Sequence, residues 1–421
     1  MLDINLIRQN PELYKKAAID KKTNFDIDNL LSVDEKRRSL QVKVDDLRAL
    51  KNSASKEIAN LQGSQKQAAI DKMQSTTTEE KNLSEELQEI EAEFNNLMLL
   101  AQAPASSDTP VGKDDSENVE MYTWGEVTKF DFEPLDHVTL GEKLDIIDIP
   151  RGVKVAGSRN YFLKGDGARL ELAVLMYTLD KLASKEFTAF LPPLLVNYEA
   201  MMGTSYFPGG EDQAYTIPSD EKYLIGTSEV SVTSYHGGEI LNEDELPKKY
   251  AGYSSCFRRE AGTYGKDTHG LYRIHQFQKV EQVIICKNDM EESKKMHEFI
   301  LKNAEEVLQD LKLPYRVVAV CTGDMGQGQY YKNDIETWMP SRNSYGETHS
   351  CSTFLDFQSR RLNLRYRDKD GNTKFCHTLN NTCIASPRIL IPILETYQNS
   401  DGTVTIPAVL RPYMGGKEKI G

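Results

Sequence analysis

Apolar residues recur at spacings of about three and four along the first hundred residues of the chain. Between Asp28 and Ala101 the sequence has one glycine and no proline. The apolar positions are Leu40, Val44, Leu47, Ala54, Ile58 and Leu61, followed later by Leu83, Leu87, Ile90, Phe94 and Leu97. Lys51 is the one polar residue in this seam. A heptad-like stripe of this kind predicts two long helices that pack along their apolar edges.

The stripe is interrupted at Gly63 and at the polar stretch Ser75–Thr78. Two helices joined by a polar turn predict an antiparallel helical hairpin. A helix of about 30 residues is about 45 Å long. Because each helix has only one partner, we expect this arm to project into solvent.

The two predicted helices differ in their charged residues. The first has Lys36, Arg37, Arg38, Lys43, Arg48, Lys51 and Lys56, whereas the second has Glu79, Glu80, Glu85, Glu86, Glu89, Glu91 and Glu93 against Lys81. The pattern by itself favours solvated faces with ion pairs between the helices. The functional alternative is a basic stripe that contacts a phosphate backbone.

The stretch Ala101–Asn118 is rich in Pro, Ala, Ser and Asp, which is typical of a linker. Beyond it, helical patterns at 168–184 and 290–311 alternate with β-type runs at 283–286 and 315–320. This mixture predicts an α+β domain built on an antiparallel sheet. We therefore expect a helical hairpin domain at 1–103 with its arm at about 28–100, a linker at 104–118 and the larger domain at 119–421.

Composition narrows the class of protein. The 421 residues carry a net charge of −13, which argues against a protein that coats DNA or RNA by bulk charge, so any nucleic-acid site is expected to be a local basic surface. The six cysteines form no Cys-x-x-Cys pair, which predicts reduced thiols. Met1–Asn10 lacks the apolar stretch of a signal peptide, and no run has the roughly 18 apolar residues of a membrane helix. The expected location is the cytoplasm, with no membrane association.

A nucleotide site has to be built from side chains, because the sequence has neither of the two common glycine-rich phosphate loops. The densest candidate is 256–282, predicted as strand, loop and strand. Alternation places Arg258 and Glu260 on one face, and Phe277 and Glu281 on one face of the return strand. An arginine suits a phosphate and an aromatic ring suits a base. The alternative is a charged hairpin with ordinary cross-strand pairs.

These residues carry a specific resemblance. Phe257-Arg258-Arg259-Glu260 and the return Arg273 to Glu281 resemble motif 2 of class II aminoacyl-tRNA synthetases, in the form found in seryl-tRNA synthetases. Further matches are Phe187–Pro193 to motif 1, Gly226–Glu229 to the Thr-x-Glu loop, Thr378–Thr382 with Arg388 to motif 3, and Ile406–Tyr413 to the usual C-terminal ending. The resemblance spans essentially the whole chain and identifies a bacterial-type member of this family.

The resemblance implies a set of ATP-binding residues. They are Arg258, Arg259, Glu260, Phe277, Glu347, Thr348, His349, Ser350 and Arg388. Arg258 is expected to bind the α-phosphate and the reacting carboxylate, and Arg388 the γ-phosphate, which makes these two the catalytic residues. Glu260 is expected to contact the adenine amino group, and Phe277 to stack on adenine.

The resemblance also implies a serine pocket and a metal site. The pocket residues are Thr227, Ser228, Glu229, Arg258, Glu281 and Thr382. Glu281 and Thr382 suit the serine hydroxyl, and Glu229 suits the ammonium group. Glu347 and Ser350 are the implied ligands of the Mg²⁺ that accompanies ATP.

The implied activity is ATP-dependent activation of L-serine and its transfer to tRNA(Ser) by a homodimer. The loop Gly262–Gly270 is implied to reach the tRNA acceptor end, and the hairpin to grip the tRNA. The sequence leaves open whether tRNA(Sec) is a second substrate, and which arm residues contact RNA. DNA is not an expected partner.

Motif 3 departs from the pattern of many members of the family. The chain has Asn380-Asn381-Thr382-Cys383 in place of Asn-Gly-Ser-Gly, and Pro387 where a glycine precedes the arginine. Thr382 keeps the hydroxyl, and Pro387 predicts a helix start. The divergent archaeal form uses zinc, but Cys256 is the one cysteine near motif 2, so no zinc is expected.

Two alternatives remain open at this level. The first is an amino acid ligase of the same fold that loads a carrier protein, although such relatives lack the long arm. The second is a catalytically silent paralogue that acts as an RNA-binding or structural dimer. The joint presence of Arg258, Glu260, Glu347 and Arg388 disfavours it.

Overall fold

The computed structural model describes residues 1–262 and 269–421. The chain forms two compact units, one of Leu2–Gln102 and one of Ala103–Gly421 together with Met1. Within the described residues, no helix is long and apolar enough to cross a membrane. All six cysteines are buried free thiols.

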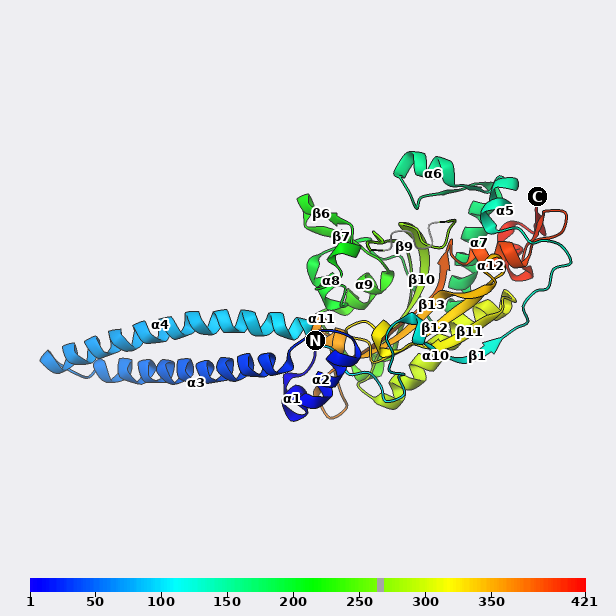
Figure 1. The fold of residues 1–421 in the computed structure, drawn as a ribbon. Helices are drawn as coiled ribbons and strands as arrows, with labels where there is room; N and C mark the ends of the chain where they lie inside the picture. Colours follow the sequence, from blue (N-terminus) through cyan, green and yellow to red (C-terminus); the bar gives the residue numbers. More distant parts are fainter. Residues whose placement is uncertain (263–268) are drawn as a thin grey trace. The chain divides into compact units, whose positions relative to one another are not determined.

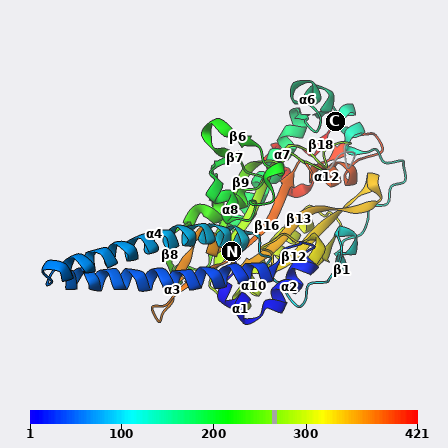
Figure 2. The ribbon, with the colours of Figure 1, turned by 60° about the vertical axis from the view of Figure 1, so that its left-hand side comes forward.

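The N-terminal unit consists of helices. They are α1 (Ile4–Gln9), α2 (Pro11–Asp20), α3 (Ile27–Ile58) and α4 (Gly63–Leu100). Helices α3 and α4 run side by side as the predicted antiparallel hairpin (Figures 1 and 2). Their seam buries Leu40 and Val44 of α3 against Leu87 and Ile90 of α4. The apolar stripe therefore identified the contact edge of both helices.

The turn of the hairpin lies at 59–62, directly before Gly63. The expectation of an interruption at Ser75–Thr78 is wrong, since these residues continue α4. The hydroxyls of Thr76, Thr77 and Thr78 donate to the carbonyl oxygens four residues earlier, at 2.8–3.1 Å. Satisfied in this way, the polar side chains do not compete with the helical backbone for hydrogen bonds.

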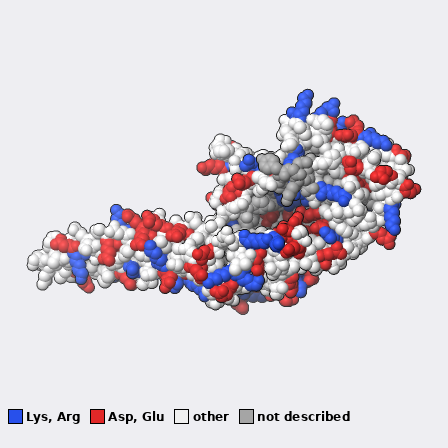
Figure 3. Space-filling view, in the orientation of Figure 1, with Lys and Arg blue, Asp and Glu red and all other residues white. Residues whose placement is uncertain are grey.

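Ion pairs join the two helices of the hairpin. Lys36 lies 2.9 Å from Glu86, and Lys51 lies 2.7 Å from Glu80, which also contacts Arg48. Acidic and basic side chains are interspersed along the hairpin face that Figure 3 shows. The interpretation as interhelical ion pairs is thus confirmed for these residues, and Lys51 is the polar seam residue that the pattern singled out.

A buried carboxylate stabilises the base of the hairpin. The side chain of Asp34 is fully buried, and it accepts hydrogen bonds from Arg8, Arg37 and Arg38 at 2.7–3.1 Å. Burial disfavours its charge, but the arginines Arg8 and Arg37 outweigh that effect and lower the pKa of Asp34. This cluster ties α1 to α3.

The second unit is built on an eight-stranded sheet. In spatial order its strands are β1 (Val119–Trp124), β11 (Tyr315–Ala319), β12 (Tyr331–Met339), β13 (Ser344–Leu355), β16 (His377–Ser386), β10 (Gln276–Cys286), β9 (Lys248–Phe257) and β4 (Thr188–Phe190). Neighbours are antiparallel, except that β4 pairs with β9 in parallel. The predicted α+β class with an antiparallel sheet is confirmed.

Two long helices pack against this sheet. They are α7 (Gly165–Ala183) and α10 (Met290–Asp310), close to the predicted helices at 168–184 and 290–311. The shorter helices are α5 (His137–Lys143), α6 (Ile149–Ala156), α8 (Tyr198–Gly203), α9 (Ser228–Thr233), α11 (Phe357–Leu362) and α12 (Leu390–Thr396). The shorter strands are β2 (Ile147–Asp148), β3 (Phe162–Leu163), β5 (Leu195–Val196), β6 (Thr216–Ile217), β7 (Lys222–Leu224), β8 (Ile240–Asn242), β14 (Arg365–Arg367), β15 (Thr373–Phe375), β17 (Val404–Thr405) and β18 (Lys419–Ile420).

The two faces of the central strands differ in their surroundings. The amides of Gln282 on β10 and Asn381 on β16 both donate to the carbonyl oxygen of Ile300 on α10. Their neighbours Glu281 and Thr382 point to the other face, because side chains alternate along a strand. Helix α10 therefore covers one face of the central strands and leaves the other for a polar site.

Candidate active site

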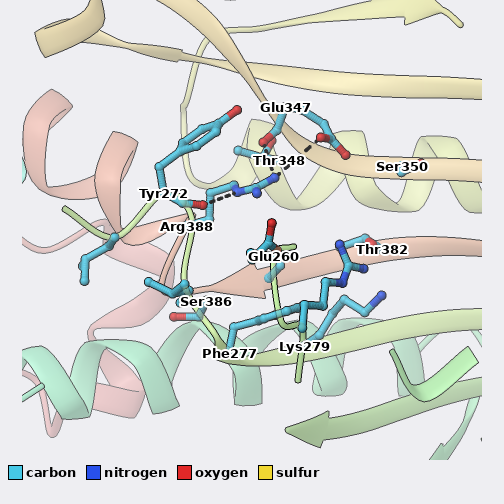
Figure 4. Close-up of a pocket in the computed structure, with 14 residues that line it drawn as sticks. Glu260, Tyr272, Phe277, Lys279, Glu347, Thr348, Ser350, Thr382, Ser386 and Arg388 are labelled. Atoms are coloured by element: carbon cyan, nitrogen blue, oxygen red, sulfur yellow. Dashed lines mark hydrogen bonds and ion pairs between the residues drawn. The ribbon is translucent and has the colours of Figure 1, made fainter. Parts of the chain in front are cut away.

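A polar pocket lies on this open face, over β10, β13 and β16 (Figure 4). Its lining is Arg258, Glu260, Leu271, Tyr272, Ile274, Phe277, Lys279, Glu347, Thr348, Ser350, Thr382, Ala385, Ser386 and Arg388. A second hollow with a cavity volume of about 650 Å³ adjoins it and shares Arg258, Glu260, Glu347 and Arg388. The structure thus brings together residues that lie up to 130 positions apart in the sequence.

Arg258 follows the end of β9 and lines both hollows. Its Nε donates to the carbonyl oxygen of Gly226 at 3.2 Å, and its guanidinium carbon lies 5.3 Å from the centre of the Phe277 ring. The backbone of Arg258 is bonded to the carbonyl oxygen and the ring Nδ1 of His275, directly before β10. These contacts hold the guanidinium group in one place, next to the ring predicted to stack on a base.

Glu260 lines the same pocket for a different reason than alternation predicts. Strand β9 ends at Phe257, and Glu260 adopts a left-handed backbone conformation with φ of 53°. The expectation that Arg258 and Glu260 share a strand face is therefore wrong in its geometry, because the chain has left the strand. A 2.7 Å ion pair with Arg273 holds the Glu260 carboxylate at the pocket.

Arg388 enters the pocket from the segment after β16. Its Nε donates to the carbonyl oxygen of Tyr272, and its Nη1 to that of Glu347, at 3.1 and 3.0 Å. The guanidinium group lies 4.4 Å from the centre of the Tyr272 ring (Figure 4). The next helix begins at Leu390, so the prediction that Pro387 opens it is wrong, and a turn over 387–389 precedes it.

Glu347 and Ser350 on β13 present oxygen atoms to the pocket. Burial disfavours the charge of Glu347, but Arg388, Lys332 and Arg258 outweigh it and lower its pKa. A charged carboxylate and a hydroxyl are hard ligands of the kind that Mg²⁺ prefers. Within residues 1–262 and 269–421, no group of three or more His, Cys, Asp or Glu side chains forms a metal cage.

The other predicted ATP residues differ in their placement. Thr348 lines the pocket, and its hydroxyl lies 2.6 Å from that of Thr337. His349 is buried beside Thr348 and outside the pocket lining, and burial lowers its pKa to about 4. The side chain of Arg259 is exposed and also lies outside that lining.

Thr382 and Lys279 line the pocket, and both contact the buried carboxylate of Glu281. The Thr382 hydroxyl donates to Glu281 Oε2 at 3.2 Å, and Lys279 Nζ lies 2.5 Å from the same oxygen. All three side chains are more than nine-tenths buried. Because both donors use Oε2, the described contacts leave Oε1 of Glu281 as an acceptor for a further donor.

Helix α9 supplies the second carboxylate of this region. Thr227 caps the helix by accepting from the backbone N–H of Glu229, and Glu229 is buried. Burial and the negative charge of Glu281 raise the pKa of Glu229 to about 7. Ser228 is placed differently, since its hydroxyl donates to the carbonyl oxygen of Gly252. The residues predicted to bind the substrate serine thus lie in this region, but the side chain of Ser228 is bonded to the backbone.

Several site residues were missed from the sequence. Lys279 lies two residues before Glu281 on β10, so strand alternation was a signal that could have found it. Tyr272 and Arg273 precede that strand, where periodicity gives no information. Of the predicted loop Gly262–Gly270, residues 263–268 lie outside the described residues.

The chemistry of the pocket suits a nucleotide and a zwitterion. Arg258 and Arg388 supply positive charge to the pocket and Phe277 supplies an aromatic ring. The buried carboxylates Glu229 and Glu281 lie behind the lining, where Glu281 contacts the lining residues Lys279 and Thr382. The nearby thiol of Cys256 is buried, and burial raises its pKa, so it is not an activated nucleophile. The geometry favours charge stabilisation over covalent catalysis.

Two family models match the chain. The seryl-tRNA synthetase N-terminal domain matches residues 1–100, and the class II tRNA synthetase core domain for G, H, P, S and T matches residues 215–397. A serine–tRNA ligase of Deinococcus radiodurans is 46% identical over 421 residues, which cover 100% of this chain and 99% of that protein. A serine–tRNA ligase of Thermodesulfovibrio yellowstonii is also 46% identical, with 99% of each chain covered.

Solved structures agree with these matches. The seryl-tRNA synthetase of Pyrococcus horikoshii complexed with ATP has a TM-score of 0.94 at 38% identity, covering 100% of this chain and 99% of that one. The cytoplasmic serine–tRNA ligase of Naegleria fowleri in complex with AMP has a TM-score of 0.89 at 32% identity, covering 100% and 98%. With its fold, its pocket and both domain models in agreement, the chain belongs to the seryl-tRNA synthetase family.

Proposed function

We propose that the pocket activates L-serine with ATP to seryl-adenylate and then transfers the seryl group to the 3′ end of tRNA(Ser). Membership of the family makes the chain an ATP-dependent serine–tRNA ligase. The proposal assigns each step to particular residues. The observation that carries it is the convergence of Arg258, Arg388 and Phe277 on one pocket.

In the first step the serine carboxylate attacks the α-phosphorus of ATP, and pyrophosphate leaves. Negative charge gathers on the phosphate oxygens, and a fixed guanidinium group stabilises it without a protein nucleophile. We assign Arg258 to the α-phosphate and the serine carboxylate, and Arg388 to the γ-phosphate. The adenine ring is assigned to Phe277, with its amino group on Glu260. The 2.7 Å ion pair between Glu260 and Arg273 supports this last role, because it fixes the carboxylate.

We assign Mg²⁺ to Glu347 and Ser350. Magnesium usually keeps one or two protein oxygen ligands together with substrate phosphates, so this small donor set fits it. The ion supplies charge neutralisation to the triphosphate. The Glu347 carboxylate also forms an ion pair with Arg388 at 3.7 Å, which keeps the arginine beside the proposed metal ligands. A zinc ion is not part of the proposed mechanism.

Serine recognition is assigned to Glu281, Thr382 and Glu229. Lys279 lies 2.5 Å from Glu281 Oε2, and a carboxylate only accepts hydrogen bonds. The free Oε1 of Glu281 therefore requires a donor on the substrate, which the serine hydroxyl supplies and an alanine methyl does not. An unmade bond at such a buried group is costly, which is the basis of selection against alanine. Glu229 is assigned to the ammonium group.

The N-terminal domain, placed at 1–103, is assigned to tRNA binding through the arm at about 28–100. The domain model for residues 1–100 and the length of the hairpin support this role. Lys43 and Lys56 are exposed on α3 and are candidates for phosphate contacts. The arm also argues against the carrier-protein ligase alternative, whose members lack it. Residues 104–118 are assigned as the linker and 119–421 as the catalytic domain.

A homodimer is proposed from the motif 1 region. Strand β4 is an edge of the sheet, and Leu191 directly after it is 81% exposed. Helix α7 exposes Leu172 and Met176 by 55% and 46%. An unpaired edge and apolar side chains in one region of the chain are features of an interface. Because charged tRNA is consumed in translation, we place the enzyme in the cytoplasm.

The first prediction concerns Arg258. Replacing it with alanine removes the guanidinium group from the α-phosphate, and Arg258→Ala should slow serine-dependent ATP–pyrophosphate exchange by about 100- to 1,000-fold. Arg367→Ala, an exposed position on β14, is the control and should exchange as the unchanged enzyme does. Exchange within threefold of the control would refute the assigned role.

The second prediction concerns the arm. Removing residues 48–80 and joining Leu47 to Lys81 through a short glycine-containing turn keeps the inner seam around Val44 and Leu87. Exchange without tRNA should stay within about twofold, whereas charging of tRNA(Ser) should fall by at least about 100-fold, because phosphate contacts are lost. Both activities are measured on one preparation. Unchanged charging would mean that the outer arm does not bind tRNA.

The third prediction concerns the dimer. Analytical ultracentrifugation of the unchanged chain should give the mass of two chains. The double variant Leu172→Glu and Met176→Glu should have a measured mass closer to that of one chain, because buried charges destabilise an apolar interface. Val42→Glu, at an exposed apolar position of α3, is the matched control and should leave the mass unchanged. A single-chain mass for the unchanged protein would contradict the proposal.

A further inference from the structure

A buried glutamine from a different helix contacts Glu229. Gln358 lies in the first turn of α11, and its side chain is 1% exposed. Its Nε2 donates to Oε1 of Glu229 at 2.8 Å. A hydrogen bond to a charged acceptor in a buried place is stronger than one at the surface. The bond occupies Oε1, and the amide therefore determines how the carboxylate is turned.

The amide is itself held by a hydroxyl group on β16. Thr378 Oγ1 donates to Oε1 of Gln358 at 2.6 Å, and Thr378 is fully buried. In the flipped orientation the amide oxygen of Gln358 would face the Glu229 carboxylate, and two acceptors repel each other. Thr378, Gln358 and Glu229 thus form a directed chain in which the amide donor points at the carboxylate.

Glu229 needs such a donor because its other surroundings, taken together, favour its protonation. Three charged residues face Glu229. Glu281 and Lys279 do so from β10, and Arg258 does so from the end of β9. Tyr206, after α8, also faces it and is neutral, since burial raises its pKa. Burial and Glu281 favour protonation of Glu229, whereas Gln358, Lys279 and Arg258 favour its charge.

We propose that Gln358, oriented by Thr378, is a positioning residue that keeps Glu229 charged and turned towards the ammonium group of the amino acid. The inference rests on the assignment of Glu229 to that ammonium group. It adds Gln358, on α11 between the motifs, and gives a positioning role to Thr378, the first residue of motif 3. A neutral or rotated Glu229 loses the charge contact with the substrate.

A purely structural role predicts something different. If Gln358 served only to join α11, α9 and β16, its loss would lower stability and the amount of active enzyme. It would not move the pH dependence of serine binding. The pH profile therefore separates positioning from packing.

The sign of the pH effect follows from the link between the protonation of Glu229 and the binding of serine. The pKa of Glu229 is about 7, and the charged form that binds an ammonium group dominates above it. The KM for serine should therefore rise as the pH falls through this range. Loss of the Gln358 donor raises the pKa further, so that the rise should begin at a higher pH.

The test is serine-dependent ATP–pyrophosphate exchange by the full chain between pH 6 and 8.5. At pH 7, Gln358→Leu should raise the KM for serine by about tenfold or more, while the KM for ATP changes by less than about twofold. The variant should also shift the acidic rise of the serine KM to higher pH. Thr378→Val should act in the same direction, and Thr378→Ser, which keeps the hydroxyl, should restore the unchanged behaviour.

Gln282→Leu is the matched control. Gln282 is equally buried and bonded at both ends, to Ile300 and Asn303, but it lies on the opposite face of β10. It should leave the pH profile of the serine KM in place. If Gln358→Leu does not fold, the comparison of Thr378→Val with Thr378→Ser decides the question, since these two differ in the hydroxyl group.

The outcomes separate this inference from the function on which it rests. A higher serine KM in Glu229→Gln, with unchanged serine KM and pH profile in Gln358→Leu and Thr378→Val, would overturn the positioning role alone. An unchanged serine KM in Glu229→Gln would instead overturn the assignment of Glu229. An equal fall in kcat for Gln358→Leu and Gln282→Leu, without a pH shift, would show a structural role and also overturn the inference.

Discussion

Two buried carboxylates, Glu229 and Glu281, lie close enough for the charge of Glu281 to raise the pKa of Glu229, and their mutual repulsion is the constraint on which the site depends. Like charges in a region of low polarity favour protonation of one of them. Here Lys279 contacts Glu281 directly, and Gln358 donates to Glu229. Each carboxylate thus keeps one oxygen occupied by the protein. The other oxygen is available to a substrate that carries a donor, and an amino acid with an ammonium group and a hydroxyl group provides two.

The sheet explains how this arrangement is held. Glu281 and Lys279 come from one strand and Thr382 from its neighbour, all on the face opposite α10. Arg258 lines both hollows, together with Glu260, Glu347 and Arg388. A rigid strand array positions charged groups more accurately than loops do, and fixed charges need no reorganisation when the transition state forms. The fold therefore contributes to catalysis mainly by keeping charged groups in place.

The long elements could be predicted well from the sequence, for physical reasons. The hairpin follows from a seam such as Leu40 and Val44, and the α+β core from alternating strand and helix patterns. Local rules failed where the backbone leaves regular structure. Thr76–Thr78 are helical, with their hydroxyls bonded back to the helix, and Glu260 lies beyond the strand with a positive φ. The contacts of Gln358 with Glu229 and Thr378 join segments 129 and 20 residues apart, which no local pattern predicts.

The central claim is that the pocket selects serine by requiring a hydroxyl donor opposite Glu281. The most direct measurement is pyrophosphate exchange with each of the twenty amino acids, followed by charging of total tRNA with serine. The account predicts that serine supports exchange and that kcat/KM for alanine is lower by about 10,000-fold, since alanine leaves a buried acceptor unpaired. Comparable exchange with alanine, or serine-dependent exchange without charging of tRNA, would contradict it.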